Sequence, residues 1–243
     1  MQISDDLYLG TAFIGGSNIS GGPSPQELGV GPMGRTYSYD ILPLTLQAAG
    51  LSVSATPAGA GNLVLAAGTG VTTVVDSTNV TRYVLDVPRC VTVTAVGVNT
   101  AVFTVSGYDV YGQFMTQLIA APSTSTVATN KAFKSVTQIA ISAAAGSAIT
   151  AGFNDKFGLP VRVTNATYVV NAKWDAVLAA DAGTFVASDP TSPATSSTTD
   201  VRGSYTPSTA SNGIRRLLFT VFIPALGAGP NATRIGAVGV NQA

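Results

Sequence analysis

The chain has 243 residues, enough for one large domain or two small ones with a sizeable core. Charged residues make up 10% of it, against roughly 25% in ordinary soluble domains, and the formal net charge is zero. This balance supplies no basic stripe for nucleic acid, and it favours association with neighbouring subunits over free solubility. The most apolar run, residues 217–226, is interrupted by Thr220 and Pro224 and falls well short of the ~20 residues that span a bilayer, so we expect no membrane partner.

The residue types that carry most enzyme and metal chemistry are scarce. The chain has no histidine and one cysteine, Cys90, which excludes histidine-based catalytic triads, a structural zinc site and an intrachain disulfide. We expect Cys90 to act as a small buried hydrophobe. Asp109 and Asp155 lie in glycine-containing segments, and we expect them to cap turns rather than to form a calcium site or an acid pair. The prediction is therefore a non-enzymatic protein without a cofactor or metal.

The chain begins with a segment rich in glycine and proline, residues 1–34, which shows no helical or strand period long enough to fold alone. Two interpretations stay open: a disordered tail, or an arm that becomes ordered across a neighbouring subunit. Apolar side chains that are unusual for a solvated tail favour the arm, and they are our interface candidates there: Leu7, Tyr8, Leu9, Phe13 and Ile14.

Strand-like alternation dominates the middle of the chain. Short strands are predicted over residues 37–46, 51–53, 61–65, 71–75, 82–87, 136–142, 161–163, 167–174 and 184–187. Residues 91–119 read as three consecutive strands joined by turns, a β-meander around which the rest is arranged. Residues 120–130 and 154–160 are predicted to be a loop and a polar turn, and residues 176–180 are a weak candidate for a short helix.

The last part of the chain alternates between polar and apolar segments. Residues 188–211 are rich in Ser, Thr and Pro, which predicts a long surface loop or linker. Residues 217–223 form a continuous apolar strand that we expect to be buried on both faces. Arg215 and Arg216 directly precede that strand. We expect them either to pair with acids on a neighbouring subunit or to protect the strand from aggregation, and they complete the interface candidates.

Many short strands separated by Gly, Pro and Asn, with no apolar helical period that lasts three turns, predict an all-β fold. We expect a β-sandwich of jelly-roll type, with an extended N-terminal arm and a C-terminal tail. The predicted organisation is an arm over residues 1–36, a sandwich core over 37–187, a loop over 188–211, and a closing strand with a tail over 212–243.

Three segments within residues 88–163 carry a family resemblance: RCVTVTAVGVNTAVFTVSGYDVYGQFMTQLI, KAFKSVTQIAI and FGLP. A strand that ends in G-x-D, a glycine turn, a second strand and a later K-x-F-x-x-V segment resemble the head-associated structural proteins of tailed bacteriophages. Over about a third of its length the chain is similar to their capsid cement or decoration group. The segment RGSYTPS and the Gly/Ala-rich C-terminal tail also suit phage structural proteins.

The resemblance implies a virion protein on the outer surface of the capsid, bound to the major capsid protein and self-associated as a dimer or trimer. Pairing at strand edges would supply directional hydrogen bonds between subunits. The alternatives are another virion component (tail tube, fibre or major shell protein) and a carbohydrate-binding adhesion module. The adhesion module would need exposed aromatic side chains at Tyr108, Tyr111, Phe114 and Trp174.

Overall fold

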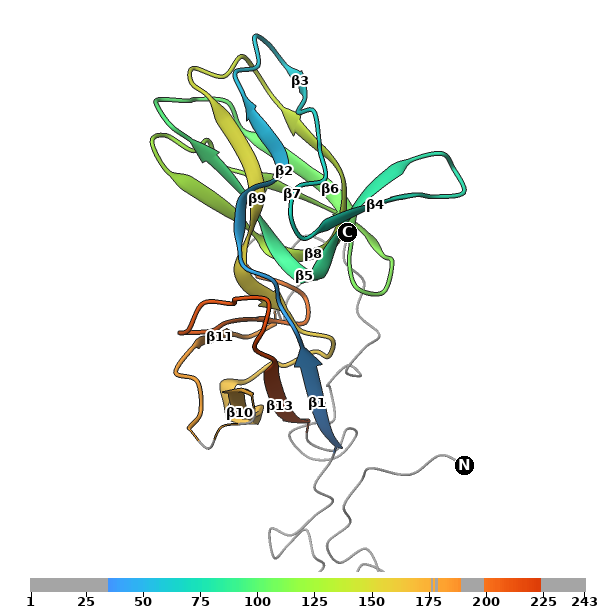
Figure 1. Ribbon diagram of the computed structural model, residues 1–243, viewed down its shortest axis with the longest axis vertical. Coiled ribbons are helices and arrows are strands. Elements are labelled where there is room, and N and C mark those ends of the chain that lie inside the picture. Colours follow the sequence, from blue (N-terminus) through green and yellow to red (C-terminus); the bar gives the residue numbers. More distant parts are fainter. Residues whose placement is uncertain (1–34, 176, 178, 189–198, 224–243) are drawn as a thin grey trace, which may run out of the picture.

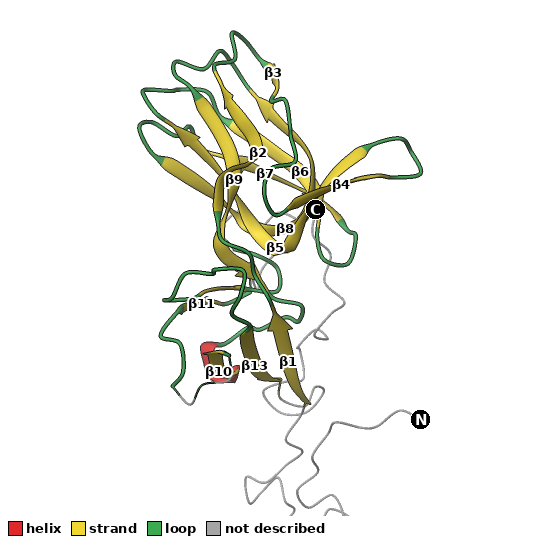
Figure 2. Cartoon of the chain, viewed as in Figure 1, coloured by secondary structure: helices red, strands yellow, loops and turns green. Residues whose placement is uncertain are grey.

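The computed structural model describes residues 35–175, 177, 179–188 and 199–223. Within them the chain is built from antiparallel strands and one short 3-10 turn, η1 (Ala166–Tyr168) (Figure 2). A large curled sheet forms one part of the molecule, and a smaller part that contains β1, β10 and β13 lies beneath it (Figure 1). The predicted all-β fold is confirmed, and its curled antiparallel sheet is consistent with a β-sandwich. The jelly-roll connectivity stays a prediction.

The strands have the following bounds: β1 (Arg35–Ile41), β2 (Gln47–Ala55), β3 (Gly61–Asn62), β4 (Val71–Val75), β5 (Thr81–Ala95), β6 (Phe103–Tyr108), β7 (Phe114–Ile119), β8 (Thr126–Ile141), β9 (Ile149–Gly158), β10 (Val169–Trp174), β11 (Thr184–Val186), β12 (Ser204–Thr206) and β13 (Leu217–Ile223). The large sheet has the order β11-β12-β9-β5-β8-β6-β7, with β2 added to β9, β3 to β8 and β4 to β5. Two long strands, β5 and β8, organise it, because each changes partners along its length. The register shifts between them allow the sheet to curl.

The predicted three-strand meander is only partly correct. β6 and β7 do form a hairpin, but residues 91–95 belong to β5, and β8 lies between β5 and β6. Two segments predicted to be irregular are strands instead, since residues 126–130 begin β8 and residues 154–158 end β9. Local alternation identifies a strand but not its partner, which here is more than 30 residues away in the sequence.

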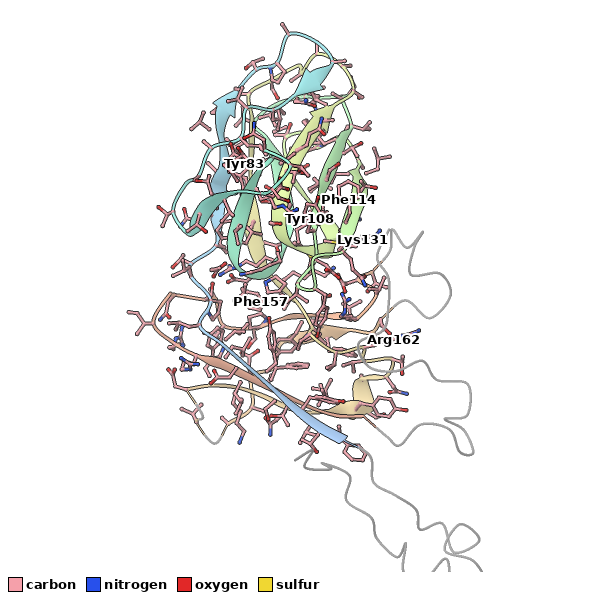
Figure 3. The ribbon with its side chains drawn as sticks, turned by 90° about the vertical axis from the view of Figure 1, so that its right-hand side faces the viewer. Tyr83, Tyr108, Phe114, Lys131, Phe157 and Arg162 are labelled. Carbon is pink, nitrogen blue, oxygen red and sulfur yellow. The ribbon has the colours of Figure 1, made fainter. Side chains whose placement is uncertain are left out.

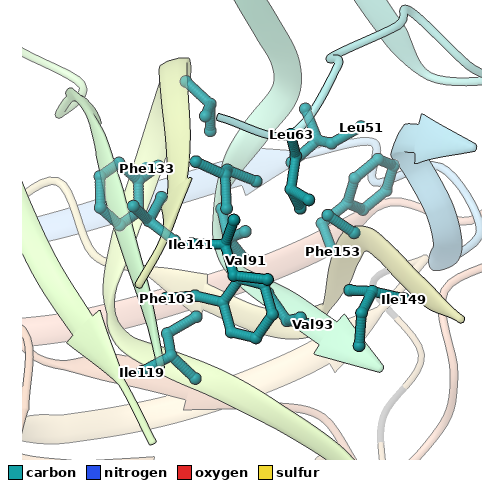
Figure 4. Packing of buried hydrophobic residues seen from close by; sticks show 14 of the residues in the cluster. Leu51, Leu63, Val91, Val93, Phe103, Ile119, Phe133, Ile141, Ile149 and Phe153 are labelled. Carbon is teal, nitrogen blue, oxygen red and sulfur yellow. The ribbon is translucent and has the colours of Figure 1, made fainter. Parts of the chain in front are cut away.

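The core of the curled sheet is a cluster of aliphatic and aromatic side chains (Figure 4). Phe103, Phe133 and Phe153 are essentially without solvent exposure, and they come from three different strands, β6, β8 and β9. Strict alternation on β6, where every second residue is buried, gives that strand one core face and one outer face. We call this core the upper cluster.

A second group of buried side chains, the lower cluster, belongs to the three-stranded sheet β1-β13-β10 and to the end of β9. On the central strand β13, Leu217, Phe219 and Val221 are buried, whereas the residues between them are half-buried. The expectation that this strand is buried on both faces is therefore wrong. A three-stranded sheet has only one face against the lower cluster, so its central strand alternates like the others. Trp174 at the end of β10 is also in this cluster and is 6% exposed.

The Ser/Thr/Pro-rich stretch departs from its prediction in its second half. Residues 199–205 are buried, and β12 pairs with β9 and β11 rather than forming a surface loop. Asp200 explains part of this path, because its carboxylate accepts the backbone N–H groups of Ala132 and Arg202. Composition predicts a loop here because it averages over the stretch, whereas Asp200 within the stretch is anchored by a distant strand, β8.

Candidate interaction surfaces

The boundary between the two clusters is held by a fully buried arginine. Arg89 on β5 donates through Nε to Asp86 and through Nη1 to Asp155, at 2.9 and 3.0 Å, and through Nη2 to the carbonyl of Leu44. Its guanidinium lies about equally far from the rings of Phe153 in the upper cluster and Phe157 in the lower cluster, 5.0 and 5.1 Å from their centroids. The charge thus joins the two parts of the molecule at one point.

Asp155 is one of the two aspartates predicted to cap turns, and for it the prediction is wrong. It lies within β9, and besides Arg89 it accepts hydrogen bonds from the hydroxyl and the backbone N–H of Ser211, at 2.6 and 2.9 Å. Its carboxylate is 10% exposed. With Arg89 and Ser211 as donors, this group holds distant segments together.

Asp109 does cap its turn, as predicted, and it also belongs to a second buried ion pair. Its Oδ1 accepts the backbone N–H groups of Tyr111 and Gln113, both at 2.8 Å, and its Oδ2 accepts Nη1 of Arg202 at 2.9 Å. Both side chains of the pair are 1% exposed, and the guanidinium lies 4.7 Å from the centre of the Tyr111 ring. The sequence gives no sign of this pair, because its members are 93 residues apart.

Two further polar side chains lie inside the fold, Cys90, which is buried, and Lys134, which is half-buried. Cys90 is completely buried, as predicted, and burial raises the pKa of its thiol to about 12. Burial lowers the pKa of Lys134, whose ammonium donates to the carbonyls of Leu85 and Asp86. In the part of the chain that the structure describes, no group of three metal-ligating side chains is present, and no helix is long and apolar enough to cross a membrane.

The predicted interface residues are only partly within the described ranges. Leu7, Tyr8, Leu9, Phe13 and Ile14 lie outside them. Arg216 forms a two-pronged ion pair with Asp40 of its own chain, with both side chains about half exposed, and Arg215 lies over the ring of Trp174 at 5.4 Å. Both arginines flank β13, and their pairing with a neighbouring subunit stays a prediction.

A surface on the outer face of the curled sheet combines two of the aromatic residues named in the sequence analysis, Tyr108 and Phe114, with Arg82 and Leu118, which the sequence did not single out. Arg82 lies 3.7 Å from the centre of the Tyr108 ring, and that ring meets Phe114 edge-on with centroids 5.5 Å apart. Figure 3 labels Tyr108 and Phe114 near each other on the large sheet. Phe114 and Leu118, on the same face of β7, are 52% and 62% exposed. We call Arg82, Tyr108, Phe114 and Leu118 the outer strip. On β7 both faces carry apolar residues, so the sequence alone does not indicate which face is exposed.

A hairpin formed by β4 and the start of β5 projects from the body of the molecule (Figure 1). Its valines Val74, Val75 and Val80 are 52%, 59% and 41% exposed. Asp76 at its turn accepts hydrogen bonds from the Thr78 hydroxyl, the Val80 N–H and Nε of Arg82, and these bonds lower the pKa of the carboxyl.

A shallow pocket of about 250 Å³ opens at the base of this hairpin, between the hairpin and the region of β3 and β8. Tyr83 is its one ionisable lining residue, and the hydroxyl of Tyr83 donates to the carbonyl of Leu65. The pocket therefore offers no acid or base positioned for catalysis.

No protein-family model matches the sequence, and no curated protein and no solved structure shows significant similarity to it. The surfaces described above and the resemblance within residues 88–163 are therefore what supports a functional proposal. Of those surfaces, the outer strip and the β4 hairpin present the exposed apolar side chains that an interface requires.

Proposed function

We propose that the protein is a non-enzymatic structural component of a tailed-phage virion, a decoration protein that binds the major capsid protein on the outer surface of the icosahedral shell. The sequence resemblance within residues 88–163 supports the class of protein. The outer strip is the single structural observation that carries the proposal, because it supplies a contact surface of the kind that such a protein needs.

The outer strip has the composition of a contact surface. Aromatic side chains and arginine are enriched at the centre of protein interfaces, and a few such residues dominate binding. Here Phe114 is held by the edge-on contact with Tyr108, and Tyr108 is covered in turn by Arg82. Side chains that are already ordered lose less conformational entropy on binding, so the strip can bind without a large ordering cost.

The electrostatics of the strip point to an apolar partner surface. Arg82 is its one charged residue, and the guanidinium is neutralised by Asp76, 2.8 Å away. A capsid surface with a shallow apolar groove and a polar rim would complement it. Many copies bound in this way, each bridging adjacent shell subunits, would oppose the outward pressure of packaged DNA.

The first experiment is to count the protein in purified particles by quantitative mass spectrometry. We expect a copy number comparable with that of the major capsid protein. A few to dozens of copies would place the protein in the tail or at a vertex, and absence from the particle would overturn the virion assignment.

The second experiment tests the outer strip through binding to shells that lack the protein. We expect the Phe114→Ser and Leu118→Ser variants to bind at least about tenfold more weakly, since truncating a hot-spot residue at the centre of an interface costs about 2 kcal/mol or more. Ile214→Ser is the matched control, because Ile214 is 82% exposed and lies before β13, outside the strip. Equal binding by the strip variants and the control would exclude the strip as the contact surface.

The exposure of the aromatic side chains bears on the carbohydrate-binding alternative. Tyr111 and Phe114 are about half exposed, as this alternative requires of them, although the Arg202 guanidinium lies over the Tyr111 ring. Trp174 is buried in the lower cluster, whereas the adhesion module would need it exposed. Binding of the chain to a glycan array, with loss of binding in the Phe114→Ser variant, would favour the adhesion module over the decoration protein.

A further inference from the structure

The free edge of β4 leads to an inference that goes beyond the proposed function and does not depend on it. β4 pairs with β5 on one side, in a register without shifts. On the other side, no strand of the described residues pairs with it. An exposed strand edge is a template for pairing with another chain, and proteins normally protect such edges with charge, proline, bulges or a covering segment.

The other edge strands that the structure describes do have such protection. β10 has a bulge and carries Lys173, and β1 carries Asp40. Carbonyls of β2 accept the N–H groups of residues 66 and 68, and a carbonyl of β7 accepts the Lys131 ammonium. β3 and β11 are only two and three residues long. Among the described residues, β4 has only one such contact, at its first residue, where the N–H of Val71 donates to the carbonyl of Gly68, and the rest of its edge has none of these features. All five of its residues, Val-Thr-Thr-Val-Val, are β-branched and uncharged, and none is proline.

The backbone groups that face outward on β4 can be assigned from the hairpin. The N–H of Asp76 donates to the carbonyl of Val80, so these two residues form a hydrogen-bonded pair across the hairpin. Hydrogen-bonded and non-hydrogen-bonded pairs alternate along an antiparallel ladder, which turns the N–H and C=O groups of Thr73 and Val75 away from β5. The N–H of Val71 fits this alternation, because it donates away from β5, to the carbonyl of Gly68.

We propose that two copies of the chain associate by antiparallel pairing of their β4 edges. A two-fold axis places the same edge on both sides of the contact, so whatever suits one copy suits the other. The edge itself is uncharged, and the two charges of the hairpin, Asp76 and Arg82, neutralise each other within it. Two hairpins therefore meet without like-charge repulsion, while the exposed side chains of Val74 and Val75 lose contact with water.

The proposal is tested on the full chain by sedimentation velocity across micromolar concentrations. Thr73 is exposed and lies at the middle of β4, and its neighbour across the hairpin, Tyr83, is uncharged. Antiparallel pairing over the whole length of β4 brings residue 73 of the two copies side by side. A charge placed there would therefore lie close to the same charge on the other copy. We expect a wild-type dimer that weakens at least about tenfold in Thr73→Lys and in Thr73→Glu, because like charges about 5 Å apart repel. An equal mixture of the two variants should recover the dimer.

Thr81→Lys is the matched control, because Thr81 is exposed in the same hairpin but lies on β5, whose backbone is already paired with β4. This variant should dimerise like the wild type. Thermal unfolding of each variant checks that the hairpin substitutions leave the fold intact.

Three results would overturn the proposal: a wild-type chain that stays monomeric, dimers that persist in both Thr73 variants, or equal disruption by Thr81→Lys. Hydrogen exchange provides an independent readout. The amides of Thr73 and Val75 should gain protection as concentration rises. Protection that is the same at every concentration would mean that another segment of the same chain covers the edge, which also overturns pairing between copies.

Discussion

Replacing Arg89 by methionine tests whether the buried charge holds the two parts of the molecule together. The substitution keeps an unbranched side chain of similar length but removes the guanidinium. Asp86 and Asp155, whose side chains are 11% and 10% exposed, then lack the cation that neutralises them. The carbonyl of Leu44 also loses a donor. Each of these groups lost contact with water on folding and is now left incompletely bonded.

The size of the effect follows from this burial. Removing one partner of a buried ion pair lowers the free energy of unfolding by about 3–5 kcal/mol, a large fraction of the roughly 5–15 kcal/mol typical of a folded domain. Arg216→Met provides the matched control, because Arg216 and Asp40 form an ion pair whose side chains are 57% and 48% exposed. Solvent screens such pairs, and the control should lose at most about 1 kcal/mol.

Urea unfolding with two probes measures both the stability and the coupling. The fluorescence of Trp174, the one tryptophan in the chain, follows the lower cluster, and far-ultraviolet circular dichroism follows mainly the large sheet. We expect the two transitions to coincide in the wild type. In Arg89→Met we expect the midpoint to fall by about 1–2.5 M, for an m-value of about 2–3 kcal/mol per M. The midpoint of Arg89→Lys should lie between those of the wild type and Arg89→Met, since an ammonium keeps the charge but cannot replace the guanidinium's fork of donors.

A double-mutant cycle separates loss of the pair from general damage. Adding Asp155→Asn to Arg89→Met neutralises one of the stranded carboxylates, so the double variant should lose less than the sum of the two single variants. If Arg89→Met loses no more stability than Arg216→Met, the carboxylates are hydrated without the arginine, and the buried charge does not hold the two parts of the molecule together.

Three further predictions concern single positions. Gly152→Ala should destabilise the fold by more than about 1 kcal/mol in the same urea assay, because an added Cβ would lie 1.9 Å from the Gln47 carbonyl oxygen, whereas Gly59→Ala, with no atom within 4 Å of its Cβ, should be nearly neutral. At Asp181, burial opposes ionisation, but the surrounding hydroxyl and N–H donors outweigh it and lower the pKa of the carboxyl. The wild type should therefore be more stable than Asp181→Asn above pH 4 and lose that advantage as the pH falls further. An advantage that is constant with pH would contradict this. The thiol of Cys90, with its pKa raised to about 12, should react with iodoacetamide at neutral pH only after unfolding, as measured by intact mass, and rapid labelling of the native chain would show that the site is open.

The sequence predicts strands well where alternation or an apolar run is bounded by turn residues. β4 and β13 have the bounds that the sequence predicts, residues 71–75 and 217–223. Strand partners were not predictable in the same way. β8 separates β5 from β6 although β6 follows β5 in the chain, and such pairing depends on the packing of the whole core rather than on any local pattern.

The candidate surfaces were less predictable than the strands. β7 carries Phe114 and Leu118 on one face and Met115 and Ile119 on the other, and only the second pair is buried. Hydrophobicity is the same on both faces, so the sequence does not say which one the core takes. Arg202 shows the opposite difficulty, since its Ser/Thr/Pro-rich surroundings predict exposure while an aspartate 93 residues away draws it into the interior.

The burial of charged residues in this molecule lowers the number of charges on its surface. The chain has only 12 basic and 12 acidic residues, and the described part buries several of them: Arg89, Asp109, Lys131, Asp155, Arg162, Asp200 and Arg202. Buried ion pairs add little stability relative to apolar packing, but they bond in few geometries, and here the pairs of Arg89 with Asp86 and Asp155 fix the junction of the two clusters. Every charge placed inside is missing from the surface, which leaves exposed valines and an unprotected β4 edge. A neutral exterior of this kind favours association, so the buried ion pairs and the proposed contacts between subunits follow from the same distribution of charge.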